Sequence, residues 1–251
     1  MEEHAEDVWL VTANRYVAFF DIMGFKDLVF RMGHQDIYKM MKGVVDKIKF
    51  NTSMDWLGEE SKGEGANSYI RATTYSDSII VYSRDDSLES LFAFVCSVAG
   101  LTNDLFVDAV PHKGAIAYGT VTMDTDNSIF FGQPLIDAYL LQEELCFYGI
   151  VTHATIEHEI IEKSKQRPML FIEEYSCHFK SCNATNMTVV PIYLVPSDPE
   201  DADEAKERDR VLESIAKLRL KTSGHLRKYI DNTESYFNEI RKRHRPKEDN
   251  A

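Results

Sequence analysis

The sequence predicts an α+β fold in which helices cover one face of a mainly antiparallel sheet. An apolar run at residues 15–22 is typical of a buried strand and gives way to a helical pattern. Two β-type runs, 69–75 and 79–83, flank a short polar turn and predict a hairpin. The order strand, helix, strand, strand, helix, strand favours this two-layer arrangement.

The remaining elements follow in order. Apolar residues recur at helical spacing over 25–48, with a break near Gly33. Ser87 is a suitable N-cap for a second helix that continues to about residue 106. A strand at 113–123 completes the core pattern. Later we expect a strand at 128–132, a helix at 134–145, a strand at 149–155, a helix at 156–164, and strands at 169–173 and 189–195.

Composition divides the chain into four predicted segments. Residues 1–14 are expected to be a flexible arm and residues 15–196 one main domain. Residues 197–209 are acidic and contain a proline, which indicates a linker. Residues 210–251 carry apolar side chains at helical spacing and are expected to form a helical C-terminal extension.

Net charge argues against two classes of binding partner, and cysteine usage indicates the redox compartment of the protein. The net charge of −13 argues against binding to nucleic acid or to an anionic membrane. No window reaches about 18 continuous apolar residues, so no transmembrane helix is expected. Four cysteines at spacings that suggest no disulfide framework favour a reduced, cytoplasmic protein.

Two acids are the candidate metal ligands. Asp21 stands near the end of a buried strand, and Asp77 stands at the predicted hairpin tip. The hypothesis is that they share a divalent metal site, because an acid approached by an apolar run is costly to leave without a partner. The alternatives are that Asp21 is a helix cap or turn acid and that Asp77 is an ordinary hairpin residue.

Four motifs in this order resemble those of the class III nucleotidyl cyclases. Residues 20–25 (FDIMGF) resemble the element that opens the cyclase domain, and residues 76–81 (SDSIIV) resemble its metal-binding hairpin. Residues 113–121 (KGAIAYGTV) are similar to a later strand of the family, with lysine for arginine. Residues 132–138 (GQPLIDA) are similar to the start of the helix that follows.

The resemblance implies a ferredoxin-type βαββαβ core and a two-metal site. In that family two aspartates and one main-chain carbonyl bind two divalent cations, Mn²⁺ or Mg²⁺. The positions that match here are Asp21, Asp77 and the main chain of Ile22. In such a site the ions assist attack of the ribose 3′-hydroxyl on the α-phosphate and neutralise the departing pyrophosphate.

The resemblance also implies nucleotide contacts. Phe20, Gly24 and Phe25 belong to the turn whose backbone N–H groups face phosphate oxygens, and Lys113 is expected to add a positive charge beside the phosphates. Lys113 has the alternative of a strand lysine that extends to solvent. Two residues of the hairpin, Thr73 and Tyr75, are expected to line the base pocket, although β-propensity alone also explains them.

The sequence departs from the purine cyclases at the positions that read the base. Thr73 stands where those enzymes have lysine or glutamate, and Ile129 stands where they have aspartate or cysteine. An apolar isoleucine cannot accept a hydrogen bond from the exocyclic amine of adenine.

The family's two transition-state residues are also absent. Ile136 or Asp137 stands at the asparagine position, and Leu140 or Leu141 stands at the arginine position, depending on a shift of one residue. Two polar neighbours, Tyr139 and Gln142, are the candidate substitutes.

Taken with the missing purine readers, the opening motif and the helical C-terminus resemble the pyrimidine cyclases of bacterial Pycsar anti-phage defence. That resemblance implies conversion of UTP, or CTP, to a cyclic nucleotide that activates a separate effector. It also implies a homodimer with the site at its interface. Two alternatives stay open: a catalytically inactive cyclase-like domain that binds a nucleotide or a partner, and an adenylate or guanylate cyclase with unusual base readers.

Overall fold

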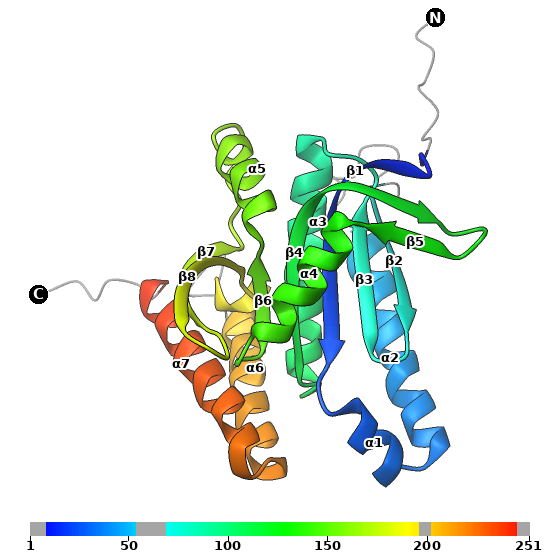
Figure 1. The fold of residues 1–251 in the computed structure, drawn as a ribbon. Helices are drawn as coiled ribbons and strands as arrows, with labels where there is room; N and C mark the ends of the chain where they lie inside the picture. Colours follow the sequence, from blue (N-terminus) through cyan, green and yellow to red (C-terminus); the bar gives the residue numbers. More distant parts are fainter. Residues whose placement is uncertain (1–8, 54–68, 196–201, 245–251) are drawn as a thin grey trace, which may run out of the picture.

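The computed structural model describes residues 9–53, 69–195 and 202–244. In this part of the chain an eight-stranded sheet has the order β2-β3-β1-β4-β6-β8-β7, and β5 pairs with β4 outside that path (Figure 1). The strands are β1 (Thr12–Ile22), β2 (Ile70–Tyr75), β3 (Ser78–Ser83), β4 (His112–Asp124), β5 (Ile129–Gly132), β6 (Gly149–Thr152), β7 (Ile172–His178) and β8 (Asn183–Val189).

Helices connect and cover these strands. Two short 3₁₀ helices, η4 (Ile192–Leu194) and η5 (Gly224–Leu226), precede the last two α-helices. The α-helices are α1 (Phe25–Arg31), α2 (His34–Ser53), α3 (Leu88–Val107), α4 (Gln133–Glu144), α5 (Ala154–Ser164), α6 (Ala202–Lys221) and α7 (Arg227–Arg243).

The first half of the chain has the predicted βαββαβ connectivity. β1 lies between β3 and β4 and is antiparallel to both, and β2 is antiparallel to β3. The resulting order β2-β3-β1-β4, with α1–α2 and α3 as the two connections, is the ferredoxin-type arrangement. Only the β4–β6 pair is parallel among the described strand pairs, so the mainly antiparallel α+β class is confirmed.

The alternation of side chains along β1 separates two layers. Ala18 and Phe20 point into a core shared with α2 and α3, whereas Phe19 lies in a second cluster on the other face. Helix α4 crosses this second face against β1 and β4, where Ala115 and Ala117 leave room for it. The prediction that the helices cover one face of the sheet therefore holds for α2 and α3, whereas α4 lies on the opposite face.

Helix α3 begins where the sequence predicts. The Ser87 side chain accepts a hydrogen bond from the Ser90 amide at 3.2 Å, which satisfies one free N–H of the first turn. By length and composition α3 alone among the described helices is apolar enough to cross a membrane. However, 83% of its apolar window is buried inside the fold, so its hydrophobicity serves the core.

Several predicted boundaries differ from the structure. β1 begins at Thr12, inside the predicted arm, because Thr12 pairs with Thr122 of β4. Helix α6 begins at Ala202, so residues 202–209 of the predicted linker are its first turns. The strands expected at 169–173 and 189–195 are replaced by a hairpin of β7 and β8, in which many polar residues surround a few buried apolar ones, such as Tyr175 and Cys177.

The C-terminal helices bury aromatic side chains against the second half of the sheet. Tyr236 and Phe237 of α7 lie in the same cluster as Phe106 and Phe147. The Tyr236 hydroxyl also donates a hydrogen bond to Thr188 Oγ1 at 3.1 Å. The predicted helical extension is therefore packed against the sheet, with α7 on the β7–β8 side (Figure 1).

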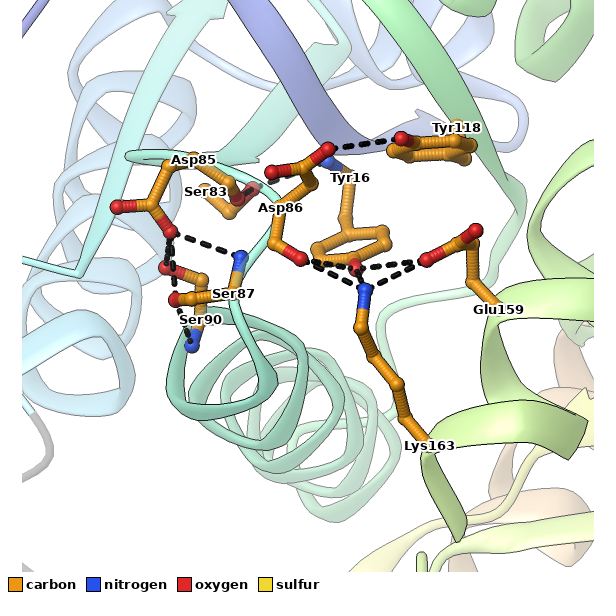
Figure 2. A network of polar contacts seen from close by, with 9 residues as sticks. All are labelled: Tyr16, Ser83, Asp85, Asp86, Ser87, Ser90, Tyr118, Glu159 and Lys163. Atoms are coloured by element: carbon orange, nitrogen blue, oxygen red, sulfur yellow. Dashed lines mark hydrogen bonds and ion pairs between the residues drawn. The ribbon is translucent and has the colours of Figure 1, made fainter.

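A polar network lies at the end of β1 away from Asp21 (Figure 2). Lys163 of α5 donates to the Tyr16 hydroxyl at 2.6 Å and to the Asp86 carbonyl at 2.7 Å, and it pairs with Glu159 at 2.5 Å. Tyr118 donates to the Asp86 carboxylate at 2.8 Å. These contacts tie α5 to β1, β4 and the β3–α3 loop.

Asp85 stabilises the start of α3 within the same loop. Its Oδ1 atom accepts from the Ser87 amide at 3.0 Å, from the Ser87 hydroxyl at 2.6 Å and from the Ser90 hydroxyl at 2.5 Å. Burial raises the pKa of Asp85, but these hydrogen bonds outweigh burial and hold the pKa well below its usual range.

Asp85→Ala should lower the free energy of unfolding at pH 7 by about 1–2 kcal/mol. Because the folded-state pKa is depressed, this stabilisation is present above the unfolded pKa of about 3.9 and is lost as the pH falls below it. Urea unfolding at several pH values measures the difference. Asp126→Ala, in an exposed turn, is the matched control, and a wild-type advantage that persists undiminished at low pH would contradict the assignment.

Candidate active site

The two candidate metal ligands meet at one end of the sheet. Asp21 is the next-to-last residue of β1 and is paired with Ser78 of β3 and with Lys113 of β4. Asp77 lies in the β2–β3 turn. The Ile22 amide donates to the Asp77 carbonyl at 3.0 Å, which holds this turn against the end of β1. Residues far apart in the sequence thereby form one polar group.

The charges around Asp21 are unbalanced. Burial raises the pKa of Asp21, and the neighbouring Asp77 carboxylate raises it further. Lys113 opposes this shift, whereas Glu143 of α4 adds to it. Half-buried acids with too little local positive charge favour binding of a cation.

Lys113 lies inside this group and does not extend to solvent. Its side chain is 4% exposed, and its Nζ atom donates to the Glu143 carbonyl at 3.3 Å and lies 3.8 Å from Glu143 Oε1. Burial lowers the pKa of Lys113, while Glu143 and Asp21 act to raise it. Sequence reasoning missed Glu143, because only the crossing of α4 over β4 brings it to Lys113.

The two hairpin residues lie on the same face as Asp21. Tyr75 is paired with Ser78, and Ser78 is paired with Asp21, so all three side chains share one side of the sheet. Thr73 shares this side because it lies two residues before Tyr75 on β2. Tyr75 is 86% exposed, which leaves it free to contact a ligand. Their role in a base pocket stays a prediction.

The side chain of Phe20 points away from the candidate site, so its expected contact with the nucleotide could be made only by its backbone and stays a prediction. Phe20 is fully buried in the core beneath α2 and α3, with its ring centroid 6.3 Å from that of His112. Neighbouring residues of a strand point to opposite faces. Phe20 must therefore point away from the side on which Asp21 lies.

The turn after β1 has the expected form. Gly24 adopts a φ of 74°, which only glycine occupies freely, and its carbonyl accepts from the Leu28 amide at 3.1 Å as α1 begins. Phe25 packs partly against the core. Phosphate contacts by Gly24 and Phe25, and metal binding by the main chain of Ile22, stay predictions.

Ile129, which occupies the second base-reading position, lies far from Asp21 of its own chain. Ile129 is exposed on β5 and is paired with Asp124, at the opposite end of β4 from Lys113. At about 3.3 Å per residue, the two ends of this strand are roughly 35 Å apart. Ile129 and Asp21 of the same chain therefore cannot contact one nucleotide.

The candidate transition-state residues lie on different faces of α4, some exposed and some buried. Ile136 and Leu140 are exposed, whereas Leu141 packs into the second cluster. Gln142 is buried, so it does not reach the surface of α4. Tyr139 is half-exposed with its ring centroid 5.4 Å from that of Phe19, which makes it the better placed of the two candidate substitutes.

The donor set fits a hard divalent cation. Among the described residues no three His, Cys, Asp or Glu side chains converge as a metal-binding cluster. The donors predicted for a cation are the Asp21 and Asp77 carboxylates and the Ile22 carbonyl. Mg²⁺ and Mn²⁺ are suited to such a site, because they accept few carboxylates and take their other ligands from water and phosphate.

Comparison with known proteins gives a distant structural likeness. No family model and no curated protein matches the chain. A solved bacterial light-regulated adenylyl cyclase matches 82% of this chain and 98% of its own, with 12% identity and a TM-score of 0.48. A second structure of a bacterial light-regulated adenylyl cyclase matches 81% of this chain and 58% of its own, with 12% identity and a TM-score of 0.47. These values are too low to support an inference about activity.

Asp21→Asn should raise the thermal midpoint of the metal-free protein. The folded state raises the pKa of Asp21, so its ionisation is unfavourable to folding and that penalty grows as the pH rises through the folded pKa. We expect a gain of about 2–4 °C at pH 7, the shift that about 1 kcal/mol produces in a domain of this size.

The gain should shrink as the pH is lowered, and differential scanning calorimetry in a chelator measures it. Asp46→Asn, an exposed acid on α2, is the control and should leave the midpoint unchanged. A destabilised Asp21→Asn variant would show that Asp21 has a structural role instead.

Proposed function

We propose that the chain is a metal-dependent nucleotidyl cyclase that converts a pyrimidine nucleoside triphosphate, UTP or CTP, to the 3′,5′-cyclic nucleotide and pyrophosphate. The observation that carries this proposal is the meeting of Asp21 and Asp77 at one strand end, with a buried Lys113 beside them. The ordered cyclase-like motifs supply the reaction class.

Each candidate residue has a separate role in the proposed reaction. Asp21, Asp77 and the Ile22 carbonyl would hold two divalent cations, whose chemistry is to activate the 3′-hydroxyl and to neutralise the pyrophosphate. Lys113 contributes a fixed positive charge that its contacts with Glu143 orient. Thr73 and Tyr75 lie on the same face of the sheet as Asp21, where the base is expected to bind.

The pyrimidine preference rests on two positions. Thr73 and Ile129 replace the charged or polar side chains with which purine cyclases read the base. The smaller pyrimidine ring presents a different hydrogen-bonding edge, for which those readers are not needed. UTP is the first choice because the pyrimidine cyclases that the sequence resembles more often use it, and a signalling role in anti-phage defence follows from the same resemblance.

A symmetric homodimer completes the proposal. Because Ile129 lies far from Asp21 of its own chain, a nucleotide held by the acids would meet the β5–α4 surface only from a second copy. That surface carries exposed apolar side chains and a shallow hollow of about 260 Å³, as a dimer interface requires. Its exposed members are Ile129, Phe131, Ile136, Tyr139 and Leu140.

Two other functions remain candidates. A purine cyclase fits the same acids and the same fold. A catalytically inactive nucleotide-binding domain is favoured by the apolar residues at the transition-state positions, Ile136 and Leu140. Incubation of the pure protein with each of the four nucleoside triphosphates and Mn²⁺ separates the three functions by product.

Asp21→Ala and Asp77→Ala should each reduce turnover of UTP or CTP by about a thousandfold or more, because each removes a metal ligand. Liquid chromatography of the cyclic nucleotide and release of pyrophosphate measure the loss, and circular dichroism checks the fold. Asp46→Ala is the matched control. Full activity in either variant would disprove the metal assignment, and cyclic AMP or cyclic GMP as product would disprove the pyrimidine preference.

The double variant Ile136→Glu/Leu140→Glu should be monomeric and should lose nearly all cyclase activity, because it places charges in an apolar interface. Analytical ultracentrifugation gives the mass, and the cyclase assay gives the activity. Ile161→Glu is the matched control, since Ile161 on α5 is 48% exposed and Ile136 is 51% exposed. A monomeric wild type with full activity would rule out the composite site.

A further inference from the structure

A cavity of about 500 Å³ lies beyond the end of β1. Its walls come from α1, α2, the turn between α3 and β4, and the C-terminal end of α6. This volume falls within the range of small-molecule pockets. Four separate segments of the chain therefore line one open cavity, which contains neither Asp21 nor Asp77.

The cavity adjoins the proposed nucleotide site but contains neither candidate metal ligand. Its walls include Val44 and Val110 of the core on the α2–α3 face and Leu218 of the second cluster, so it lies where the two layers meet beyond the end of β1. The two sites share one short link, because Met23 and Gly24 line the cavity and directly follow the strand end. The Met23 amide donates to the Pro111 carbonyl at 2.8 Å, which fixes this wall.

Apolar side chains form most of the interior. Methionines contribute from both sides of α1 and from α2, and an unbranched thioether side chain adapts to ligands of different shape. Such a lining suits the apolar body of a small molecule. The apolar residues that line the cavity include Met23, Leu28, Met32, Met40, Val44 and Leu218.

Two lysines give the lining an excess of positive charge. Within the cavity Asp27 lies 3.8 Å from Arg31, and Asp108 forms its 3.0 Å ion pair with Lys47. Lys39 of α2 and Lys221 of α6 also line the cavity, and neither has an ion pair within the described residues. In a chain of net charge −13 these cations favour an anionic group.

We propose that this cavity binds a small amphipathic anion, with an apolar body among the methionines and a single carboxylate or phosphate head near Lys39 and Lys221. The cavity contains neither candidate metal ligand and shares only Gly24 with the turn that is predicted to contact phosphate, so binding can be measured without metal and without turnover. The proposal and the proposed function are therefore tested by separate measurements.

Isothermal titration of the full chain with octanoate and octyl phosphate tests the site. We expect saturable binding of one molecule per chain, and the tighter of the two identifies the preferred head. Octanol, which has the body without the charge, should bind about tenfold more weakly. Acetate and inorganic phosphate, which have the charge without the body, should not bind. Absence of binding by both octyl anions would overturn the proposal.

Lys39→Gln/Lys221→Gln should weaken binding of the better anion about tenfold and leave octanol unaffected. The matched control is Lys42→Gln/Lys217→Gln, which removes two exposed lysines of the same helices that do not line the cavity. Equal affinity in these two double variants would show that the anionic head does not bind near Lys39 and Lys221.

Gly43→Leu should fill the cavity without unfolding the protein. Gly43 lines the cavity on α2, and a Cβ added there meets no atom within 4 Å. Leucine is also the better helix former, so the thermal midpoint should not fall. Octanoate and octyl phosphate should no longer bind, and wild-type affinity in this variant would show that they bind elsewhere.

Discussion

The position of β1 between two antiparallel neighbours is the constraint on which the rest of the site depends. Its pairing with β4 sets Asp21 beside Lys113, and its pairing with β3 brings the β2–β3 turn to the same end of the sheet. The hydrogen bond from the Ile22 amide to the Asp77 carbonyl then closes the group. A shift of one residue in this register would turn Asp21 into the core beneath α2 and α3.

The two faces of the sheet differ near the candidate site. The face beneath α2 and α3 is filled with apolar side chains. The opposite face holds the acids, Lys113 and the exposed end of the hairpin, with α4 covering only part of it. Because α4 also presents Ile136 and Leu140 outward, the same helix that positions Glu143 has an exposed apolar surface, on which the proposed dimer depends.

Sequence patterns were sufficient where structure depends on near neighbours. The strand ending at Asp21, the hairpin around Asp77 and the helix after Ser87 each follow from local periodicity and turn chemistry. The same patterns failed for β7 and β8, because the buried Tyr175 and Cys177 give only a short alternation among polar residues. The alternation of β1 also shows that the Phe20 side chain points into the core, so any contact of Phe20 with a ligand on the Asp21 face would come from its backbone.

The sequence by itself determined the α+β class, the order of the core elements and the identity of the two acids. Only the tertiary structure decided that Lys113 is buried against Glu143, that Gln142 is inaccessible while Tyr139 is not, and that α4 crosses the second face. The physical reason is that sequence patterns report only short-range structure. Periodicity reports which side of one element is apolar, whereas these contacts depend on how separate elements pack, and no local pattern encodes that.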